Sequence, residues 1–306
     1  AKGHTIIVEK STLPVRTGEL IKSILDSQKN SDNSKSFDII SNPEFLSEGS
    51  AIKDLEYPDR VLIGGNNKKA LIALGGIYSN WVPKEKIIYT NLWSSELAKL
   101  TANAFLAQRI SSINSIAAVC EKTGADVREV ARAIGTDSRI GEKFLNSGPG
   151  FGGSCFKKDI LNLVYLSDYF GLPEVGRFWE SVVELNIWNQ NRLSQIILEK
   201  LSGTLTGKNI GILGFSFKAN TNDTRESPSI QICKNLLLEG AILRIHDPKV
   251  SKKQISIDLG IYSEDDIKSN QSEEVHREMK WKKLSLDEGF FKDLDALVLL
   301  TEWEDY

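Results

Sequence analysis

One cysteine in the chain stands among residues that can support its reactivity. Residues 148–153 contain four glycines, Cys155 follows, and Asp159 comes one helical turn later. The glycines leave the backbone free to adopt positive φ and to approach a ligand closely. The apolar spacing from Ile160 onward predicts a helix, so Cys155 should lie near a helix N-terminus, where the helix dipole favours a thiolate. We interpret this segment as a catalytic centre with a cysteine nucleophile.

The remaining cysteines and the histidines point to no metal or disulfide. Cys120 and Cys233 lie in apolar helical patterns typical of small buried hydrophobes. Three scattered cysteines form neither a disulfide framework nor a zinc motif. The three histidines, His4, His246 and His276, lack ligand spacing. We therefore expect no metal, reduced thiols and a cytoplasmic protein.

Composition limits the classes of partner. The chain has 306 residues, which is enough for two ordinary domains. Its net charge of −3 leaves no basic footprint for nucleic acid. No uninterrupted apolar run has the length of a membrane span. We expect neither a nucleic-acid nor a membrane partner.

Residues 1–90 alternate strands with helices. Strands are expected at 5–9, 37–41, 60–63 and 86–89, with a helix capped by Ser11 and Thr12 that runs to about Ser27 and another at 67–79. The alternation predicts a parallel sheet. Ligands of such sheets bind at the carboxyl ends of strands, where Ser11, Thr12 and Glu44 stand, although each could equally be a cap or turn residue. No G-x-G-x-x-G follows a strand here, so we expect this domain to be incomplete and the chain to be cut at both ends.

The middle of the chain is helical. A long helix is expected at 91–123, and it could link two domains and pair with its copy in a dimer. Lys99 and Asn103 share a face of this helix, although position alone also fits two ordinary solvated residues. A short helix at 126–134 precedes a turn that carries Arg139, either a surface residue or an anion ligand. Another long helix is expected at 174–201.

The pattern of the last hundred residues predicts a second Rossmann-type unit. A strand at 208–213 enters a glycine turn, a polar loop follows, and Ser227 with Pro228 can start a helix before the strand 242–245. This is a β-α-β unit of Rossmann type, and Lys218 with Arg225 suits phosphate. Residues 251–283 are expected to form a charged, solvated excursion, and 296–303 a buried strand. The predicted fold is α/β, with two Rossmann-like doubly wound domains joined by a long central helix.

Five stretches together resemble the nucleotide-sugar dehydrogenases of the UDP-glucose/GDP-mannose dehydrogenase family. They are residues 9–15, 42–49, 95–103, 150–155 and 214–218, and they occur in the family's order. The run 105–114 is similar to the eukaryotic members that act on UDP-glucose. The resemblance implies an NAD-dependent oxidoreductase that converts UDP-glucose to UDP-glucuronate in two oxidations. It also implies three domains: 1–90 for NAD, 91–203 for dimerisation and the catalytic cysteine, and 204–306 for the UDP-sugar.

The resemblance implies a role for each matched residue. Cys155 would form the thiohemiacetal and thioester, and Lys99 and Asn103 would stabilise the oxyanion. Asp159, Glu44 and Thr12 would act on water or as acid and base. The implied substrate-binding residues are Glu44, Phe45, Leu46, Ser47, Lys99, Asn103, Arg139, Phe144, Gly150, Phe151, Gly152, Phe217 and Lys218, with Arg139 reaching the substrate of a partner subunit. The implied NAD-binding residues are Ser11, Thr12, Glu48, Cys155, Lys158 and Arg225.

Three alternatives stay open at this point. The sugar nucleotide could be a different one, because pocket loops and not the motifs would decide it. The chain could be a non-catalytic module that binds a UDP-sugar and dimerises. A thiol hydrolase would want a histidine partner, and the three histidines lie outside the motifs. The family resemblance favours a homo-oligomer, at least a dimer and, by its eukaryotic members, a hexamer.

Overall fold

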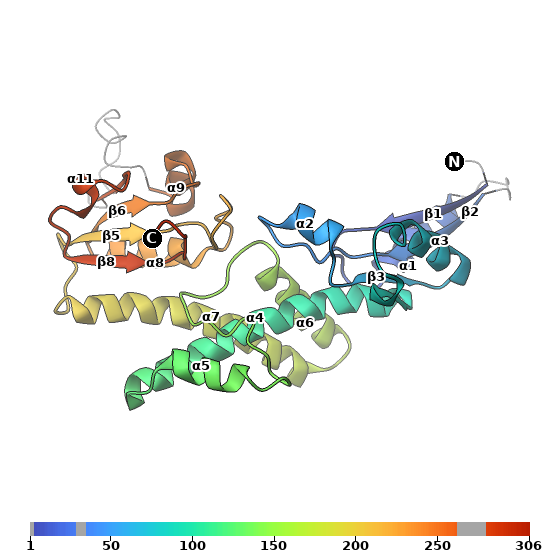
Figure 1. Cartoon of the computed structure of the whole chain (residues 1–306), viewed down its shortest axis with the longest axis horizontal. Helices are drawn as coiled ribbons and strands as arrows, with labels where there is room; N and C mark the ends of the chain where they lie inside the picture. Colours follow the sequence, from blue (N-terminus) through green and yellow to red (C-terminus); the bar gives the residue numbers. More distant parts are fainter. Residues whose placement is uncertain (1–2, 29–34, 262–279) are drawn as a thin grey trace. The chain divides into compact units, whose positions relative to one another are not determined.

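The computed structural model describes residues 3–28, 35–261 and 280–306. The chain divides into two compact units, Ala1–Asn103 and Ala104–Tyr306 (Figure 1). The units are described separately below. The long helix α4 (Leu92–Thr123) begins in the first and continues into the second, as the apolar spacing predicted.

The first unit is built on a four-stranded sheet. Its strands are β1 (His4–Glu9), β2 (Ser36–Ser41), β3 (Val61–Gly65) and β4 (Ile87–Thr90), in the order β1-β2-β3-β4. β1 pairs parallel with β2, and β3 pairs parallel with β4, but β2 and β3 are antiparallel. The prediction of a parallel sheet was wrong at this pair. The connection from β2 to β3 contains α2 (Ala51–Glu56), which buries no residue, whereas parallel neighbours need a covering crossover.

Two helices and a short 3-10 turn complete this unit. They are α1 (Thr17–Ser27), α3 (Lys68–Tyr78) and η1 (Lys84–Lys86). Side chains from β2, β3 and α3 form the core, including Ile40, Ile63 and Tyr78. The predicted start of α1 at Ser11 and Thr12 was wrong. The helix begins at Thr17 after Arg16, which is left-handed (φ 80°) and has no side-chain cap.

The second unit opens with helices. They are α5 (Val127–Gly135), α6 (Phe156–Tyr169) and α7 (Pro173–Lys200). Helix α6 begins directly after Cys155, as the sequence predicted, and packs against α7. Asp126 caps α5 by accepting a hydrogen bond from the Arg128 N–H.

The second sheet is fully parallel. Its strands are β5 (Asn209–Leu213), β6 (Ile242–His246), β7 (Lys280–Lys283) and β8 (Ala296–Leu299), in the order β7-β6-β5-β8. The helices are α8 (Pro228–Leu238), α9 (Lys252–Leu259) and α11 (Glu288–Phe291). Ser227 caps α8 and Pro228 is its first residue, so the predicted β-α-β unit is confirmed. Ile210, Ile212, Leu243 and Ile245 lie in its core.

Two predictions in this region were wrong. Residues 251–283 are not simply a solvated excursion: α9 buries Ile255 and Leu259, and the Trp281 side chain of β7, between lysines in the sequence, is fully buried in the same apolar core. Residues 262–279 of that segment lie outside the described ranges. The predicted buried strand 296–303 is only four residues long, and Leu297 and Leu299 are about half exposed (50% and 51%). Both side chains lie on one face of β8, which pairs with β5 alone among the strands that the structure describes.

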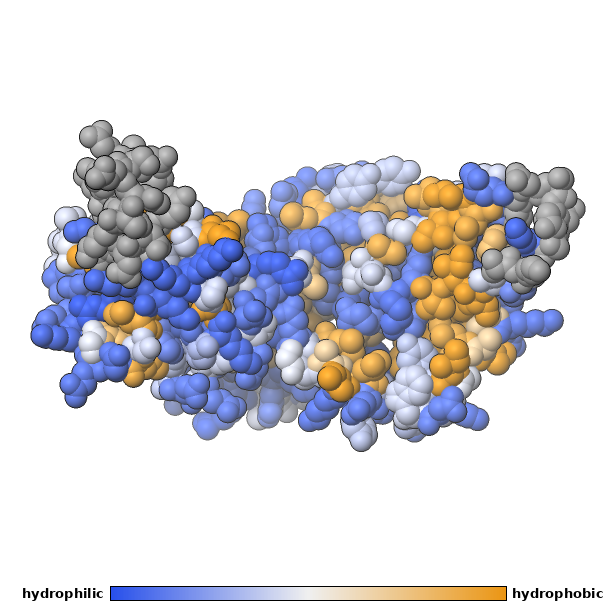
Figure 2. Space-filling view, turned by 90° about the horizontal axis from the view of Figure 1, so that it is seen from above, coloured by the Kyte–Doolittle hydropathy of each residue, from blue (hydrophilic) through white to orange (hydrophobic). Residues whose placement is uncertain are grey.

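The surface of the first unit carries a hydrophobic band. Figure 2 shows it as a continuous orange area at the end where β1, β2 and α3 lie. Exposed apolar side chains of this unit include Leu20 and Ile24 of α1 and Ile72 and Ile77 of α3. A surface of this kind is typical of a contact with another protein segment. Among the described helices, none combines the length and apolar character needed to cross a bilayer.

Candidate active site

The three cysteines differ sharply in their surroundings. Cys155 is exposed and stands at the N-cap position of α6, while Cys120 and Cys233 are buried. The Ser154 hydroxyl oxygen lies 3.6 Å from the Cys155 sulfur. Burial raises the pKa of the Cys233 thiol well above its usual range. Only Cys155 therefore combines access for a substrate with a helix N-terminus that favours negative charge.

The glycine loop before Cys155 is held in a conformation that its glycines allow. Gly150 and Gly153 have φ of 133° and 82°, a region that other residues rarely adopt. A Cβ on Gly150 would collide with the side-chain amide oxygen (Oδ1) of Asn186, and one on Gly153 would contact the Phe217 ring at 3.0 Å. The Gly153 N–H donates to the Arg225 carbonyl oxygen at 2.8 Å. The loop is thus packed against both α7 and the 214–226 region.

Three asparagines that the sequence analysis did not single out hold this loop. Asn186 of α7 accepts from the Phe151 N–H at 2.9 Å and donates to the Phe151 carbonyl at 3.0 Å. Asn189 donates to the Gly148 and Pro149 carbonyls at 2.9 and 3.1 Å. Asn114 of α4 accepts from the Gly148 N–H at 2.8 Å. The sequence contained a signal for them: each asparagine lies within a predicted helix among apolar residues, and a buried amide there needs a hydrogen-bond partner outside the helix.

A second turn, at the carboxyl end of β5, carries Phe217 and Lys218. Asp247 fixes it: its carboxylate accepts hydrogen bonds from the N–H groups of Phe215 (2.8 Å) and Ser216 (3.0 Å). Burial opposes ionisation of Asp247, but the hydrogen bonds from Ser216, Phe215, Val250 and Lys249 together lower its pKa below the usual value. The Lys218 ammonium lies 5.6 Å from the centre of the Phe217 ring. This turn packs Phe217 on the glycine loop, as the Gly153 contact shows.

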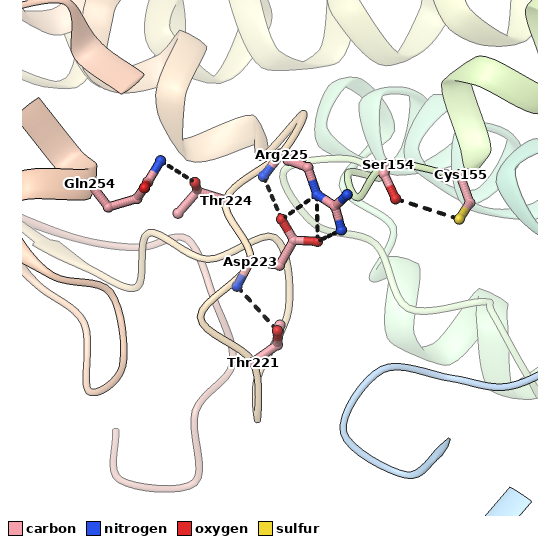
Figure 3. A network of polar contacts seen from close by, with 7 residues as sticks. All are labelled: Ser154, Cys155, Thr221, Asp223, Thr224, Arg225 and Gln254. Carbon is pink, nitrogen blue, oxygen red and sulfur yellow. Dashed lines mark hydrogen bonds and ion pairs between the residues drawn. The ribbon is translucent and has the colours of Figure 1, made fainter. Parts of the chain in front are cut away.

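The predicted phosphate ligand Arg225 is engaged with a carboxylate. Its Nε and terminal nitrogen donate to Asp223 at 2.9 and 2.6 Å. Figure 3 shows Ser154 and Cys155 beside the loop that carries this pair. Lys157 pairs with Glu226 at 2.9 Å, and Lys158 lies 3.8 Å from Asp159. Lys158 is the more exposed of these two lysines, with 61% of its side chain accessible, so it is better placed to meet an anionic ligand.

Asp159 lies one turn into α6, on the same side of the helix as Cys155. Its backbone N–H donates to the Cys155 carbonyl at 2.9 Å, which makes it the i+4 neighbour on the helix surface. The residue is fully buried, with 1% of its side chain exposed. The structure therefore brings together the thiol, a buried carboxylate, the glycine loop and the Phe217 turn within the second unit.

The first unit assembles a second group of predicted site residues. Lys99 of α4 is buried, and its ammonium lies 3.8 Å from the Glu44 carboxylate. The other Glu44 oxygen accepts from the Leu46 N–H at 2.6 Å. The Phe45 ring faces two cations, Lys99 at 5.2 Å and Arg60 at 3.8 Å. Arg60 was not predicted, because a lone arginine before a strand carries no signal of this contact.

Ser11 and Thr12 lie at the carboxyl end of β1, before α1. Ser11 is exposed and Thr12 is half-buried. Ligands of an α/β sheet bind at this end of its strands, which is where the sequence placed these two residues. Burial raises the pKa of Glu96, against the hydrogen bonds that it accepts from the Gly18 and Arg16 N–H groups.

The other predicted residues are more scattered. Arg139 pairs with Asp137 at 2.6 Å and is exposed, and Phe144 is left-handed (φ 62°) and 41% exposed. The Ser47 N–H donates to Asp54 at 2.8 Å. Glu48 is exposed and Asn103 is buried. Within the described ranges, no group of three or more histidine, cysteine or acidic side chains is arranged to hold a metal ion.

Comparison with known proteins identifies the family. Three family models match: the NAD binding domain of the UDP-glucose/GDP-mannose dehydrogenase family over residues 1–82, its central domain over 93–188, and its UDP binding domain over 211–306. The chain is 54% identical to UDP-glucose 6-dehydrogenase of Gallus gallus, covering 99% of this chain and 60% of the relative. It is 49% identical to UDP-glucose 6-dehydrogenase 1 of Arabidopsis thaliana, covering 100% and 64%.

A solved structure agrees with these sequence matches. The chain superposes on a UDP-glucose dehydrogenase from Pyrobaculum islandicum with a TM-score of 0.85 and 30% identity, covering 100% of this chain and 65% of that one. The chain thus spans about three-fifths of the length of the relatives it matches. The predicted α/β class with Rossmann-type sheets and a long central helix is confirmed. The chain belongs to the UDP-glucose/GDP-mannose dehydrogenase family.

Proposed function

We propose that the chain carries part of an NAD-dependent UDP-glucose 6-dehydrogenase, an oxidoreductase that converts UDP-glucose to UDP-glucuronate. The identity of 54% and 49% to two enzymes of that name supports the substrate. The observation that carries the chemistry is the position of Cys155, the exposed cysteine at the N-terminus of α6. Bound NAD+ would accept a hydride in each of two oxidations.

The roles of the second unit follow from its contacts. Cys155 adds to the C6 aldehyde left by the first oxidation and forms a thiohemiacetal. Loss of a second hydride converts it to a thioester, and water then releases the carboxylate and restores the thiol. Asp159, buried one turn from Cys155, takes up a proton from that water. The glycine loop 148–153 with Phe217 and Lys218 binds the UDP-sugar, and Phe144 and Arg139 extend this surface.

The roles of the first unit are electrostatic. Lys99 and Asn103 are buried donors on one face of α4, and such preorganised donors stabilise an oxyanion. Glu44, held beside Lys99 at 3.8 Å, serves as acid or base, and Thr12 holds a water. The segment Phe45–Ser47 contacts the sugar nucleotide. Ser11, Thr12 and Glu48 bind NAD. In the second unit, Lys158 and Arg225 are the residues proposed for its phosphates, although Arg225 also pairs with Asp223 at 2.6 Å.

The protein is a homo-oligomer, at least a dimer, and cytoplasmic. Exposed aromatic side chains on and after α6, together with one on α7, support an interface: Tyr165, Tyr169, Phe170 and Phe178. Free thiols at all three cysteines suit a reducing compartment. Sedimentation and cell fractionation test these two statements.

NADH formation tests the proposed function. The assay uses UDP-glucose and NAD+ with this chain and with a version extended by its flanking coding sequence. Two NADH per UDP-glucose is the expected yield. NADH formation only with UDP-N-acetylhexosamine or GDP-mannose would show that the substrate is that nucleotide sugar and not UDP-glucose. Binding of UDP-glucose without NADH formation by either protein would favour a non-catalytic module.

Replacing Cys155 tests the nucleophile. Cys155→Ser should reduce UDP-glucuronate turnover by about a hundredfold or more, because a serine hydroxyl is a poorer nucleophile without an adjacent base. Cys120→Ala is the matched control, since it changes a buried cysteine outside the site. Normal glucuronate production by Cys155→Ser would exclude the covalent mechanism.

A further inference from the structure

One buried carboxylate in the first unit joins two segments that carry candidate site residues. Glu96 lies on α4 and is only 4% exposed. One of its oxygens accepts from the Arg16 N–H at 2.7 Å, and the other accepts from the Gly18 N–H at 2.9 Å. These two N–H groups belong to the start of α1, where backbone donors have no partner within the helix. A side chain from α4 thus replaces the local cap that α1 lacks.

The loop between β1 and α1 is fixed at both ends. At its start, the Lys10 ammonium donates to Asn42 and to the Tyr78 hydroxyl, both at 3.1 Å. At its end, Arg16 adopts the left-handed conformation, which costs energy in a residue with a side chain. The two hydrogen bonds to Glu96 flank this turn. Ser11 and Thr12 lie between the two anchors.

Glu96 also shares a helix face with the proposed oxyanion donors. Lys99 is three residues further along α4 and Asn103 seven, a spacing that keeps the three side chains on one side. All three are buried. The backbone of the loop is therefore hydrogen-bonded to the same rigid element that presents Lys99.

We propose that Glu96 is a positioning residue for the reaction: it holds the Ser11–Arg16 loop, and with it Thr12, in a fixed place relative to Lys99 on α4. The proposal deepens the proposed function, because the reason to hold this loop rests on the roles of Thr12 and Lys99 there. Glu96 touches no reacting atom in this scheme and acts through the loop backbone.

A purely structural role would look different. Helix α1 also packs on α4 directly, since a Cβ on Gly18 would meet the Leu92 side chain at 2.8 Å. If packing alone held α1, removing the carboxylate would leave the loop in place. If Glu96 supported the whole unit, its loss would loosen the sheet as well as the loop.

Amide hydrogen exchange separates these cases on this chain. Glu96→Gln keeps one acceptor oxygen and replaces the other by a donor, so at least one of the Arg16 and Gly18 amides should exchange roughly tenfold faster. Amides of β3, in the core of the same unit, should keep their rates. Lys22→Gln is the matched control, because it removes an exposed charge from α1 without touching either N–H group. Unchanged exchange at both amides, or equal acceleration in β3, would overturn the proposal.

Steady-state kinetics of the intact enzyme give the second readout. Glu96→Gln should lower kcat for NADH formation roughly tenfold while KM for UDP-glucose changes less than about twofold. A changed KM with unchanged kcat, or no change in either, would overturn the positioning role. Absence of NADH from the parent enzyme would refute the proposed function instead, and the exchange experiment would still decide whether Glu96 holds the loop.

Discussion

Two buried acids stand at matching points of the two sheets, and their surroundings differ completely. Glu9 is the last residue of β1, and Asp247 directly follows β6. The Asp247 carboxylate accepts hydrogen bonds from the N–H groups of Phe215, Ser216, Lys249 and Val250. These hydrogen bonds lower the pKa of Asp247 against the opposing effect of burial. Neither oxygen of Glu9 receives a hydrogen bond from the described residues. Burial, and then the charge of Glu96, raise the pKa of Glu9 to about 7.

The comparison shows that the number of hydrogen-bond donors around a buried acid, and not its burial or its place in the sheet, decides the direction of its pKa shift. Asp247 is 1% exposed and Glu9 is 8% exposed, so desolvation opposes ionisation of both. Four backbone donors outweigh it at Asp247, and a neighbouring carboxylate adds to it at Glu9. Asp247 therefore stabilises the turn that carries Phe217, whereas ionised Glu9 destabilises the first unit.

The largest expected effect is at Asp247. Asp247→Ala should lower the free energy of unfolding by about 3 kcal/mol or more, because several buried N–H groups lose their acceptor. Urea titration of the chain measures this, with Asp305→Asn, an exposed acid near the C-terminus, as control. The stabilisation by the ionised Asp247 is present above its unfolded pKa of 3.8 and is lost as pH falls through the lowered folded value. A loss equal to that of Asp305→Asn would contradict the role of the backbone donors.

A smaller effect of opposite sign is expected at Glu9. Its folded pKa of about 7 lies above the ordinary 4.5, so its contribution to stability is complete below pH 4.5 and is lost as pH rises through about 7. Glu9→Gln removes this loss. The variant should therefore unfold at a higher urea concentration than the parent at about pH 8, with little difference near pH 4. Glu56→Gln, on the exposed face of α2, is the control, and equal midpoints at the higher pH would show that Glu9 is paired.

The smallest effect is expected at Asp295, an exposed acid at the start of β8. Hydrogen bonds from the Asn209 N–H and from Lys208 lower its pKa. Asp295→Asn should reduce the unfolding midpoint less than Asp247→Ala does, because water can replace the lost acceptor. Part of the reduction should disappear at high salt, which screens the pair with Lys208 at 3.0 Å. A loss of stability as large as that of Asp247→Ala would contradict the expectation that a buried acceptor of N–H groups stabilises the fold more than an exposed one.

Much of the fold could be predicted because local patterns and packing agree. The apolar spacing of α4 and α6 matches buried residues such as Leu100 and Ala104 of α4 and Ile160 and Leu163 of α6, and Ser227 with Pro228 starts α8 as expected. In α7 the agreement is partial, because Val182 is buried but Val175 and Phe178 are exposed. The failures occurred where distant residues took over a local task. The start of α1 is capped by Glu96, which is far away in the sequence. The strand β7 consists of lysines and one tryptophan, Trp281, whose side chain is fully buried.

The candidate site divides in the same way. The sequence predicted Cys155 at a helix start and Lys99 with Asn103 on one helix face, because these depend on spacing along a single element. It did not predict Asn114, Asn186 and Asn189 on the glycine loop or Arg60 on Phe45. Those contacts join separate elements, and no local periodicity encodes them.

The sequence by itself determined the α/β class, the β-α-β order of the last hundred residues, and the position of Cys155 directly before the start of a helix. Only the tertiary structure decided that β2 and β3 run antiparallel, that Arg225 pairs with Asp223, and that Glu9 and Asp247 have opposite pKa shifts. The physical reason is range. Helix spacing and caps act over a few residues, whereas strand direction, ion pairing and the solvation of a carboxylate depend on groups that folding brings from elsewhere in the chain.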